Sequence, residues 1–218
     1  WDREEMVETC VHVERELPHV HLRGVGVNLS CYGSIRPTPE KMNELIDIAR
    51  EVERRIGRPL ETVSGGATSS YTLVHSGAMP EGINHLRIGD REVHFEFGRS
   101  IVAECGELIT TVLFNKTTAT GRKLVIVDAS MTELIRPALY GSYHNIENIT
   151  AETDRTDKYT VVGTACESTD RFDENVSLRR SVRGDLLTIK SAGAYGMSMA
   201  SRYNLHDLPG AVYSDEIR

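Results

Sequence analysis

Apolar positions in the first ninety residues alternate between helical and strand-like spacing. A helix that ends at Pro18 is predicted by apolar residues three or four positions apart, at Met6, Val7, Cys10, Val11 and Leu17. A second helix is predicted to begin at Thr38-Pro39, where a capping hydroxyl precedes a proline, and to end at Gly57. Strands are expected at 20–29, 60–63 and 83–87, and a short helix at 69–76. Strands that alternate with helices over short connections predict parallel pairing and an α/β fold.

The pattern changes at about residue 92. Longer β-rich stretches follow one another at 100–116, 123–128, 159–165 and 185–191, and polar turns separate them. Only 131–139 has a helical pattern, which Pro137 limits, and the polar segment 147–158 is expected to be a surface loop. We therefore expect a partial (βα) barrel over residues 1–91 and an antiparallel β-barrel or sandwich domain over residues 92–218.

Length and charge restrict the class of protein. The 218 residues are too few for a full eight-stranded α/β barrel of about 250 residues plus a second domain. A net charge of −7 argues against partners such as nucleic acid or an anionic membrane. No apolar run approaches the length of about 18–20 residues that a membrane span needs, and the first five residues do not resemble a signal peptide. Four cysteines without CxxC spacing predict reduced thiols in the cytoplasm and no metal site.

Two stretches in the first hundred residues have the chemistry of anion binding. Gly65-Gly66 follows a predicted strand, and Ser69 and Ser70 open the helix after it, so that backbone N–H groups can surround a phosphate. A plain turn is the commoner outcome for such a stretch. Glu96-Phe97-Gly98-Arg99 ends another strand and can bind a carboxylate or phosphate, although a surface ion pair is the commoner outcome there.

Three further motifs lie in the second half. Arg136 and Tyr140 are one helical turn apart and can face one pocket. The thiol of Cys166 can donate a proton to a carbanion and the carboxylate of Glu167 can hold an ammonium group, whereas the usual environment of a free cysteine is the protein core. Tyr195 lies in a turn of small residues that lets its hydroxyl reach outward.

These motifs occur together and in order, and residues 92–218 closely resemble the C-terminal part of diaminopimelate decarboxylases. The resemblance is carried by the stretches EFGRSIVAE, VDASMTELIRPALYGSYH, VVGTACESTD and GDLLTIKSAGAYGMSM. Members of this family use pyridoxal phosphate and have fold type III, an α/β barrel followed by a β-domain. Phe97 stands where the family usually has proline, which alters the stiffness of that turn.

The resemblance implies a role for each matched residue. Glu96 would face the pyridine nitrogen, and the turn from Glu96 through Gly98 to Arg99 would help to hold the cofactor phosphate. The substrate carboxylate would be bound by Arg99, Arg136 and Tyr140. Cys166 would be the proton donor, Glu167 would contact the distal amino group of a diamino acid, and Tyr195 would touch cofactor and substrate. The family also implies a homodimer in which the Cys166-Glu167 motif reaches the neighbouring subunit.

Residues 1–90 resemble a different group, the ornithine racemases of the alanine-racemase-like enzymes, which also use pyridoxal phosphate. This resemblance is carried by LRGVGVNLSCYGSIRPTPEKMNELIDI, ETVSGGATSS and GINHLRIG. It implies that Ser69 or Ser70 binds phosphate and that Arg87 faces the pyridine nitrogen. A carboxylate at Glu96 keeps that nitrogen protonated, whereas a guanidinium cannot accept its proton, so the two residues favour different chemistry. We therefore predict a join between two related segments near residues 90–92.

None of the lysines matches the family's cofactor-binding lysine; they are Lys41, Lys116, Lys123, Lys158 and Lys190. This polypeptide alone is thus not expected to complete a catalytic cycle. The main hypothesis is pyridoxal-phosphate-dependent decarboxylation of diaminopimelate or a related diamino acid in lysine biosynthesis. The alternatives are an amino-acid racemase, or a non-catalytic fragment or chimera that folds against another subunit. Carbon dioxide release, loss of optical rotation without it, and sedimentation behaviour distinguish the three.

Overall fold

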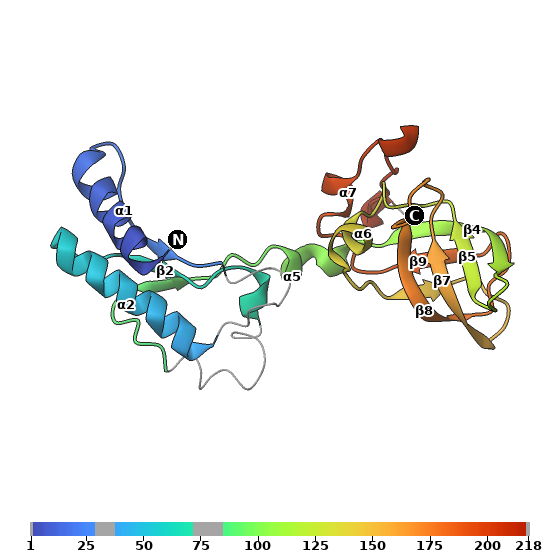
Figure 1. Ribbon diagram of the computed structural model, residues 1–218, viewed down its shortest axis with the longest axis horizontal. Helices are drawn as coiled ribbons and strands as arrows, with labels where there is room; N and C mark the ends of the chain where they lie inside the picture. Colours follow the sequence, from blue (N-terminus) through green and yellow to red (C-terminus); the bar gives the residue numbers. More distant parts are fainter. Residues whose placement is uncertain (1, 29–37, 72–84, 217–218) are drawn as a thin grey trace. The chain divides into compact units, whose positions relative to one another are not determined.

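The structure, a computed structural model, describes residues 2–28, 38–71 and 85–216. It has two compact units, Trp1–Ser100 and Ile101–Arg218 (Figure 1). The division falls after Ser100 rather than after residue 91, because strand β3 (Glu92–His94) pairs with a strand of the first unit. No helix in the described ranges is long and apolar enough to cross a membrane.

The described part of the first unit contains a parallel sheet in the order β1 (Gly24–Gly26), β2 (Thr62–Ser64) and β3. Val25 pairs with Val63, and Val63 pairs with Val93. The predicted parallel α/β arrangement is thereby confirmed for these strands. The strand expected at 83–87 is wrong over residues 85–87, which are not extended into the sheet, and residues 83 and 84 lie outside the described ranges.

Two helices pack together in this unit, α1 (Arg3–Glu16) and α2 (Pro39–Ile56). Thr38 caps α2, since its Oγ1 accepts a hydrogen bond from the backbone N of Lys41 at 3.4 Å, and Gly57 ends it with φ +81°. Both boundaries follow the sequence prediction. The buried stripe of α2 joins residues of α1, β1 and β2 in one core made of Val7, Cys10, Val25, Met42, Leu45, Ile46, Ala49, Val52, Leu60 and Val63.

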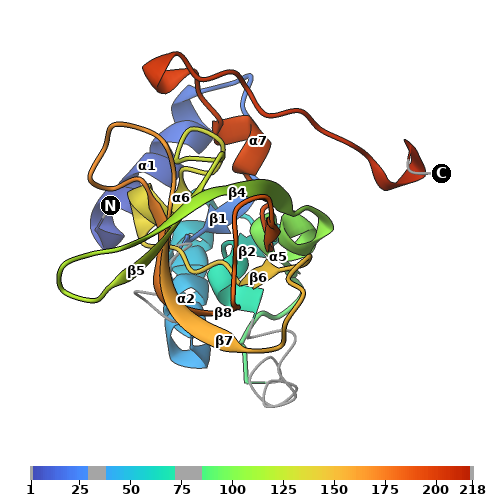
Figure 2. The same cartoon turned by 90° about the vertical axis from the view of Figure 1, so that its right-hand side faces the viewer.

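The second unit contains a six-stranded mixed sheet among its described residues, in the order β6-β9-β4-β5-β7-β8. Figure 2 shows β4 and β7 of this sheet as curved ribbons. Its strands are β4 (Leu108–Thr117), β5 (Lys123–Val127), β6 (Ile146–Asn148), β7 (Thr156–Val162), β8 (Arg171–Arg179) and β9 (Leu186–Ile189). The two edge strands approach each other, since Arg179 Nε on β8 donates to the carbonyl oxygen of Asn148 on β6 at 3.2 Å. The sheet therefore curls toward a barrel around a core that includes Val112, Val125, Val127, Leu134, Val161, Phe172, Leu178, Leu187 and Ile189.

Four details differ from the sequence prediction. The sheet is not wholly antiparallel, because the chain between β5 and β7 passes through helix α6 (Arg136–Tyr140) and β6 and so returns in the direction of β5. Residues 99–105 form short helices, α5 (Arg99–Val102) and η2 (Ala103–Cys105), rather than the start of a strand. The polar segment 147–158 begins in β6 and ends in β7, so it is a loop only at its centre. Strand β8 was missed, because it buries only Phe172 and Leu178 among polar residues.

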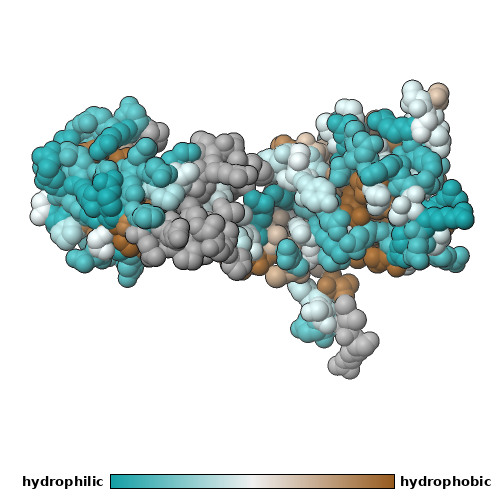
Figure 3. Space-filling model, turned by 90° about the horizontal axis from the view of Figure 1, so that it is seen from below, coloured by the Kyte–Doolittle hydropathy of each residue, from teal (hydrophilic) through white to brown (hydrophobic). Residues whose placement is uncertain are grey.

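The short elements of the second unit after β9 are α7 (Gly196–Met199), η3 (Tyr203–Leu205) and η4 (Ser214–Glu216). In the space-filling view, apolar side chains interrupt the polar surface of this unit (Figure 3). Its exposed large apolar residues include Leu139, Tyr143, Met197, Leu205 and Val212.

Candidate functional site

The three strands of the first unit are parallel, so their carboxyl ends lie at one edge of the sheet. Gly65-Gly66 follows β2 and Glu96 follows β3. The backbone N of Gly65 donates to the His94 carbonyl at 2.7 Å, and that of Glu96 donates to the Gly66 carbonyl at 2.9 Å. Ser64 Oγ donates to Glu96 Oε1 at 2.9 Å. The structure thus brings together the glycine pair and the carboxylate that the sequence indicated.

The glycine pair is required because a neighbouring ring and a neighbouring carbonyl approach it closely. A Cβ at Gly65 would lie 2.4 Å from the Phe95 ring, and one at Gly66 would lie 2.6 Å from the Val27 carbonyl oxygen. Gly66 also has φ +85°, in the left-handed region that favours glycine. This turn therefore presents backbone instead of side chains at the strand ends.

A second contact joins the two anion-binding stretches. The backbone N of Ser100, in helix α5 next to Arg99, donates to Thr68 Oγ1 at 3.3 Å in the turn η1 (Thr68–Ser70). Ser70 Oγ donates to the Gly65 carbonyl at 2.5 Å, so this hydroxyl supports the turn from inside. The Oγ of Ser100 is buried and has no hydrogen-bond partner among the described residues. We call Gly65, Gly66, Ser69, Ser70, Glu96, Gly98, Arg99 and Ser100 the strand-end group.

Phe97, the position where the family usually has proline, lies in an aromatic cluster. Its ring stacks on Phe95 with centroids 5.4 Å apart and meets the edge of Tyr71 at 5.5 Å. Such pairs contribute about 0.5–1.5 kcal/mol beyond their buried area. In this chain, aromatic packing of Phe97 therefore holds the turn, whereas in the family a proline ring would restrict its backbone.

Arg87 does not belong to the strand-end group. It precedes β3, at the opposite end of the strand from Glu96. Its Nη2 donates to Asp47 Oδ2 on helix α2 at 2.8 Å, and its backbone N donates to Asn43 Oδ1 at 2.9 Å. This guanidinium ties the segment before β3 to α2, and these contacts give no support to the prediction that Arg87 faces the pyridine nitrogen.

In the second unit, three strands run in the same direction. Strand β5 is parallel to β7, and β9 is antiparallel to β4, which is antiparallel to β5. The carboxyl ends of β5, β7 and β9 therefore lie at one edge of the sheet. The connections that leave this edge carry all the candidate residues of the unit, which we call the sheet-edge group: Arg136, Tyr140, Cys166, Glu167 and Tyr195.

Arg136 is the centre of one part of this group. The residue is only 3% exposed, and its guanidinium carbon lies 5.5 Å from the centroid of the Tyr140 ring and 5.7 Å from that of Tyr195. Tyr140 is one turn along α6, whereas Tyr195 follows β9 with a left-handed φ of +75°. A guanidinium between two phenols is suited to bind a carboxylate.

Cys166 and Glu167 are exposed in the loop between β7 and β8, and a buried carboxylate shapes this loop. Asp170, 5% exposed, accepts hydrogen bonds from the backbone N of Met131 and of Ala165, each at 2.7 Å. Burial raises the pKa of Asp170, and the two N–H donors oppose that rise. Because Cys166 is exposed, the alternative of a cysteine buried in the core does not hold.

Tyr203, in η3, donates its phenolic hydrogen to Glu167 Oε1. This hydrogen bond raises the pKa of Tyr203. Sequence reasoning missed both Tyr203 and Asp170. Asp170 ends the VVGTACESTD stretch that carries the family resemblance, but nothing in the sequence showed that its carboxylate is buried, and Tyr203 lies in none of the recognised motifs.

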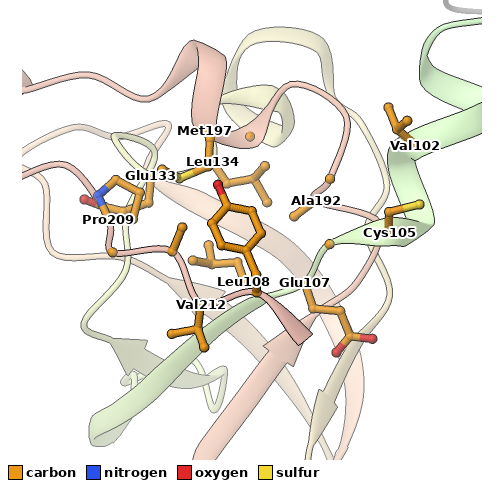
Figure 4. A pocket seen from close by; sticks show the side chains of 16 residues that line it. Val102, Cys105, Glu107, Leu108, Glu133, Leu134, Ala192, Met197, Pro209 and Val212 are labelled. Carbon is orange, nitrogen blue, oxygen red and sulfur yellow. The ribbon is translucent and has the colours of Figure 1, made fainter. Parts of the chain in front are cut away.

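A cavity of about 330 Å³ also opens at this edge, near the start of β4 (Figure 4). Leu108, Leu134 and Met197 form apolar walls, and Glu107 and Val212 lie at its margin. The Glu107 carboxylate accepts a hydrogen bond from Thr188 Oγ1 at 2.5 Å. The sequence did not predict this cavity.

A family model described as pyridoxal-dependent decarboxylase, C-terminal sheet domain, matches residues 9–193. The chain therefore belongs to the pyridoxal-dependent decarboxylase family, and the predicted use of pyridoxal phosphate is confirmed at that level.

Within this family the chain is similar to diaminopimelate decarboxylases. It is 51% identical to the one from Bacteroides thetaiotaomicron, over 97% of this chain and 57% of that protein. It is 32% identical to the one from Methanothermobacter thermautotrophicus, over 92% of this chain and 52% of that protein. The structure of Helicobacter pylori diaminopimelate decarboxylase complexed with L-lysine matches with a TM-score of 0.73 and 32% identity, over 94% of this chain and 52% of that chain. The chain thus spans little more than half the length of these relatives.

The comparisons also correct one expectation. The range matched by the family model, residues 9–193, extends well to both sides of residues 90–92, and the Bacteroides relative matches 97% of the chain. The predicted join between two families is therefore wrong. The glycine-rich turn of the first unit belongs to the same decarboxylase-like sequence as the second unit.

Proposed function

We propose that this chain forms part of an enzyme that removes the α-carboxylate of diaminopimelate or a related diamino acid, in lysine biosynthesis. The observation that carries the proposal is the sheet-edge group, where Arg136 lies between Tyr140 and Tyr195 and the same edge bears Cys166 and Glu167. The relatives named diaminopimelate decarboxylase support the choice of substrate.

The strand-end group fits pyridoxal phosphate. Its turn of two glycines presents backbone rather than side chains at the strand ends, and the buried Ser100 hydroxyl has no partner among the described residues. Glu96 would hold the pyridine nitrogen, and Gly65, Gly66, Ser69, Gly98 and Arg99 would hold the phosphate, whereas Ser70 supports the turn. When bound, the cofactor supplies an electron sink for the carbon that loses its carboxylate.

The sheet-edge group would perform the remaining tasks. Arg136 and Tyr140 would bind and orient the substrate carboxylate, and Tyr195 would touch the substrate. After carbon dioxide leaves, the thiol of Cys166 would donate its proton to the carbon that retains the electron pair. The ionised carboxylate of Glu167 would hold the distal ammonium group, which selects a diamino acid.

The racemase alternative loses its main support, because Arg87 is bound to Asp47 and Asn43 at the other end of its strand. Glu96 is then the ionisable group of the strand-end group that suits a pyridine nitrogen, and a carboxylate there favours the strong electron sink that decarboxylation needs.

We also propose a cytoplasmic homodimer. The described cysteines Cys10, Cys105 and Cys166 are free thiols, which fits a reducing compartment. The family resemblance supports a dimer in which Cys166 and Glu167 reach the neighbouring subunit. Sedimentation of the complete enzyme tests this, and a monomer with full activity would contradict it.

The function is tested with the complete enzyme, meaning this chain together with the barrel portion that its relatives possess. Incubation with diaminopimelate and pyridoxal phosphate is expected to release one carbon dioxide and form one lysine per substrate consumed. Loss of optical rotation without carbon dioxide would support a racemase instead. The absence of any reaction would support a non-catalytic protein.

A further inference from the structure

We propose that Tyr203 is a positioning residue that holds the Glu167 carboxylate in the orientation that receives the distal ammonium group of the substrate. This inference rests on the proposed function, in which Glu167 binds that ammonium. It adds a residue from a separate segment of the chain to the specificity of the site.

The hydrogen bond between Tyr203 and Glu167 determines which carboxylate oxygen remains available to the substrate. Tyr203 donates to Oε1 of Glu167, and an ionised carboxylate can only accept. One oxygen is thereby occupied and the other, Oε2, is left for a cation. Both side chains are exposed, and exposed polar pairs are weak when their backbone is mobile. The contact therefore matters only if both segments are fixed.

The segment that carries Tyr203 is fixed on both sides. The backbone N of Ser201 donates to the Thr132 carbonyl at 2.9 Å, and His206 Nδ1 lies 3.2 Å from Thr132 Oγ1. Between these anchors, Asn204 and Leu205 have φ of +53° and +61°, which non-glycine residues rarely adopt. A chain held at both ends can keep such a conformation, and here it turns the Tyr203 ring toward Glu167.

The loop that carries Glu167 is fixed on the same support. Asp170 binds the backbone N of Met131, the residue next to Thr132, and also the N of Ala165 inside the loop. The backbone N of Asp170 in turn donates to the Glu167 carbonyl at 3.1 Å. Tyr203 and Glu167 are thus held against one turn, residues 130–133, although they are 36 positions apart. Because both segments are held by the same turn, the fold fixes the orientation of the Glu167 carboxylate.

The hydrogen bond is tested in this chain without reference to activity. Tyrosines are labelled with ¹³C at Cζ and titrated by NMR, and Tyr203→Phe assigns the Tyr203 signal. In the wild type this signal is expected to titrate above the ordinary tyrosine range, and Glu167→Gln, which removes the negative charge, is expected to return it to that range. An unchanged titration in Glu167→Gln would overturn the proposal.

The positioning role is tested by kinetics of the complete enzyme. Tyr203→Phe is expected to raise KM for diaminopimelate about 3- to 10-fold, the effect of one lost hydrogen bond, with kcat within twofold. The matched control is Tyr213→Phe, an exposed tyrosine of the same terminal segment, which is expected to leave both constants unchanged. An unchanged KM in Tyr203→Phe, or an equal fall of kcat, would overturn the role. A wild type without activity would overturn the proposed function and the role with it, whereas the NMR titration still decides the contact.

Discussion

Arg136 combines three properties that single residues seldom share: it is buried, it is cationic, and its guanidinium faces two aromatic rings. Burial of a charge is costly unless the charge is compensated. The rings of Tyr140 and Tyr195 and the Ser142 hydroxyl, 3.4 Å from Nη2 of Arg136, are polar or polarisable neighbours of this charge. The sequence indicated Arg136 and Tyr140 through their spacing, but Tyr195 joins them only because β9 lies in the same sheet as β5.

Arg136→Lys tests this arrangement. Lysine keeps the charge but loses the planar fork and its stacking on Tyr140 and Tyr195. We expect kcat/KM of the complete enzyme to fall about 10- to 100-fold, corresponding to roughly 1–3 kcal/mol. The exposed Arg122→Lys is the control and should leave kcat/KM unchanged. Equal activity of Arg136→Lys and wild type would exclude a bidentate role for Arg136.

Asp170 gives a prediction about pH. Burial raises its pKa in the folded state, so between the ordinary and the raised pKa the folded protein binds more protons than the unfolded chain. The unfolding free energy should therefore fall as pH rises through this window and become level above it. Asp170→Asn should remove this part of the slope and lower stability by about 1–3 kcal/mol, because its amide cannot accept both backbone N–H bonds. Urea unfolding at several pH values measures both effects, and an identical slope in the variant would contradict the assignment.

At the scale of elements, the sequence predicted helix boundaries correctly where a single residue type favours the backbone geometry of the boundary. Helix α2 begins after Thr38 and ends before Gly57 as predicted, because the capping hydroxyl and the left-handed glycine each depend only on residues of the adjacent turn. Strand β8 was not predictable in this way, since its partner β7 supplies the pairing and only Phe172 and Leu178 face the core. Likewise, the direction of β7 depends on the path of the chain through α6 and β6, and no local sequence pattern predicts that path.

The backbone of Gly193, after β9, lies in close contact with that of Gly106, before β4. A Cβ at Gly193 would lie 2.3 Å from the Val102 carbonyl oxygen and 2.7 Å from the backbone N of Gly106. We expect Gly193→Ala to lower the unfolding free energy of the second unit by about 1–3 kcal/mol, because backbone atoms cannot yield as a flexible side chain does. Gly210→Ala, where nothing lies within 4 Å of the added Cβ, is the matched control. Equal urea midpoints for the two variants would show that this close contact can relax.

At the scale of the whole molecule, each unit contains its own hydrophobic core and its own half of the candidate residues. The strand-end group belongs to the first unit and the sheet-edge group to the second. The sequence allowed both groups to be predicted because glycines, arginines and a Cys-Glu pair appear in recognisable motifs. At Arg87 the motif suggested a cofactor contact, whereas the structure shows its guanidinium bound to Asp47 on α2, a pairing that the sequence did not indicate.

The lysines lead to a prediction for the chain by itself. Lys123 pairs with Asp157 and Lys190 with Glu147, both at 2.8 Å, and Lys41 lies in the first turn of α2. We expect no stoichiometric lysine adduct when the 218-residue chain is incubated with pyridoxal phosphate and reduced with borohydride. Mass spectrometry of the reduced protein measures this, with the complete enzyme as the positive control. One adduct per chain at a single lysine would refute the prediction.

The common direction of β5, β7 and β9 has a practical consequence for the opposite end of the sheet, where these strands begin. There the hairpin between β4 and β5 turns through Thr118 to Arg122, and nothing lies within 4 Å of a Cβ added at Gly121. Peptide tags or fluorescent labels inserted in this hairpin would thus project from the end of the unit that bears none of the chemistry. Labels attached at that point would leave the sheet-edge group uncovered.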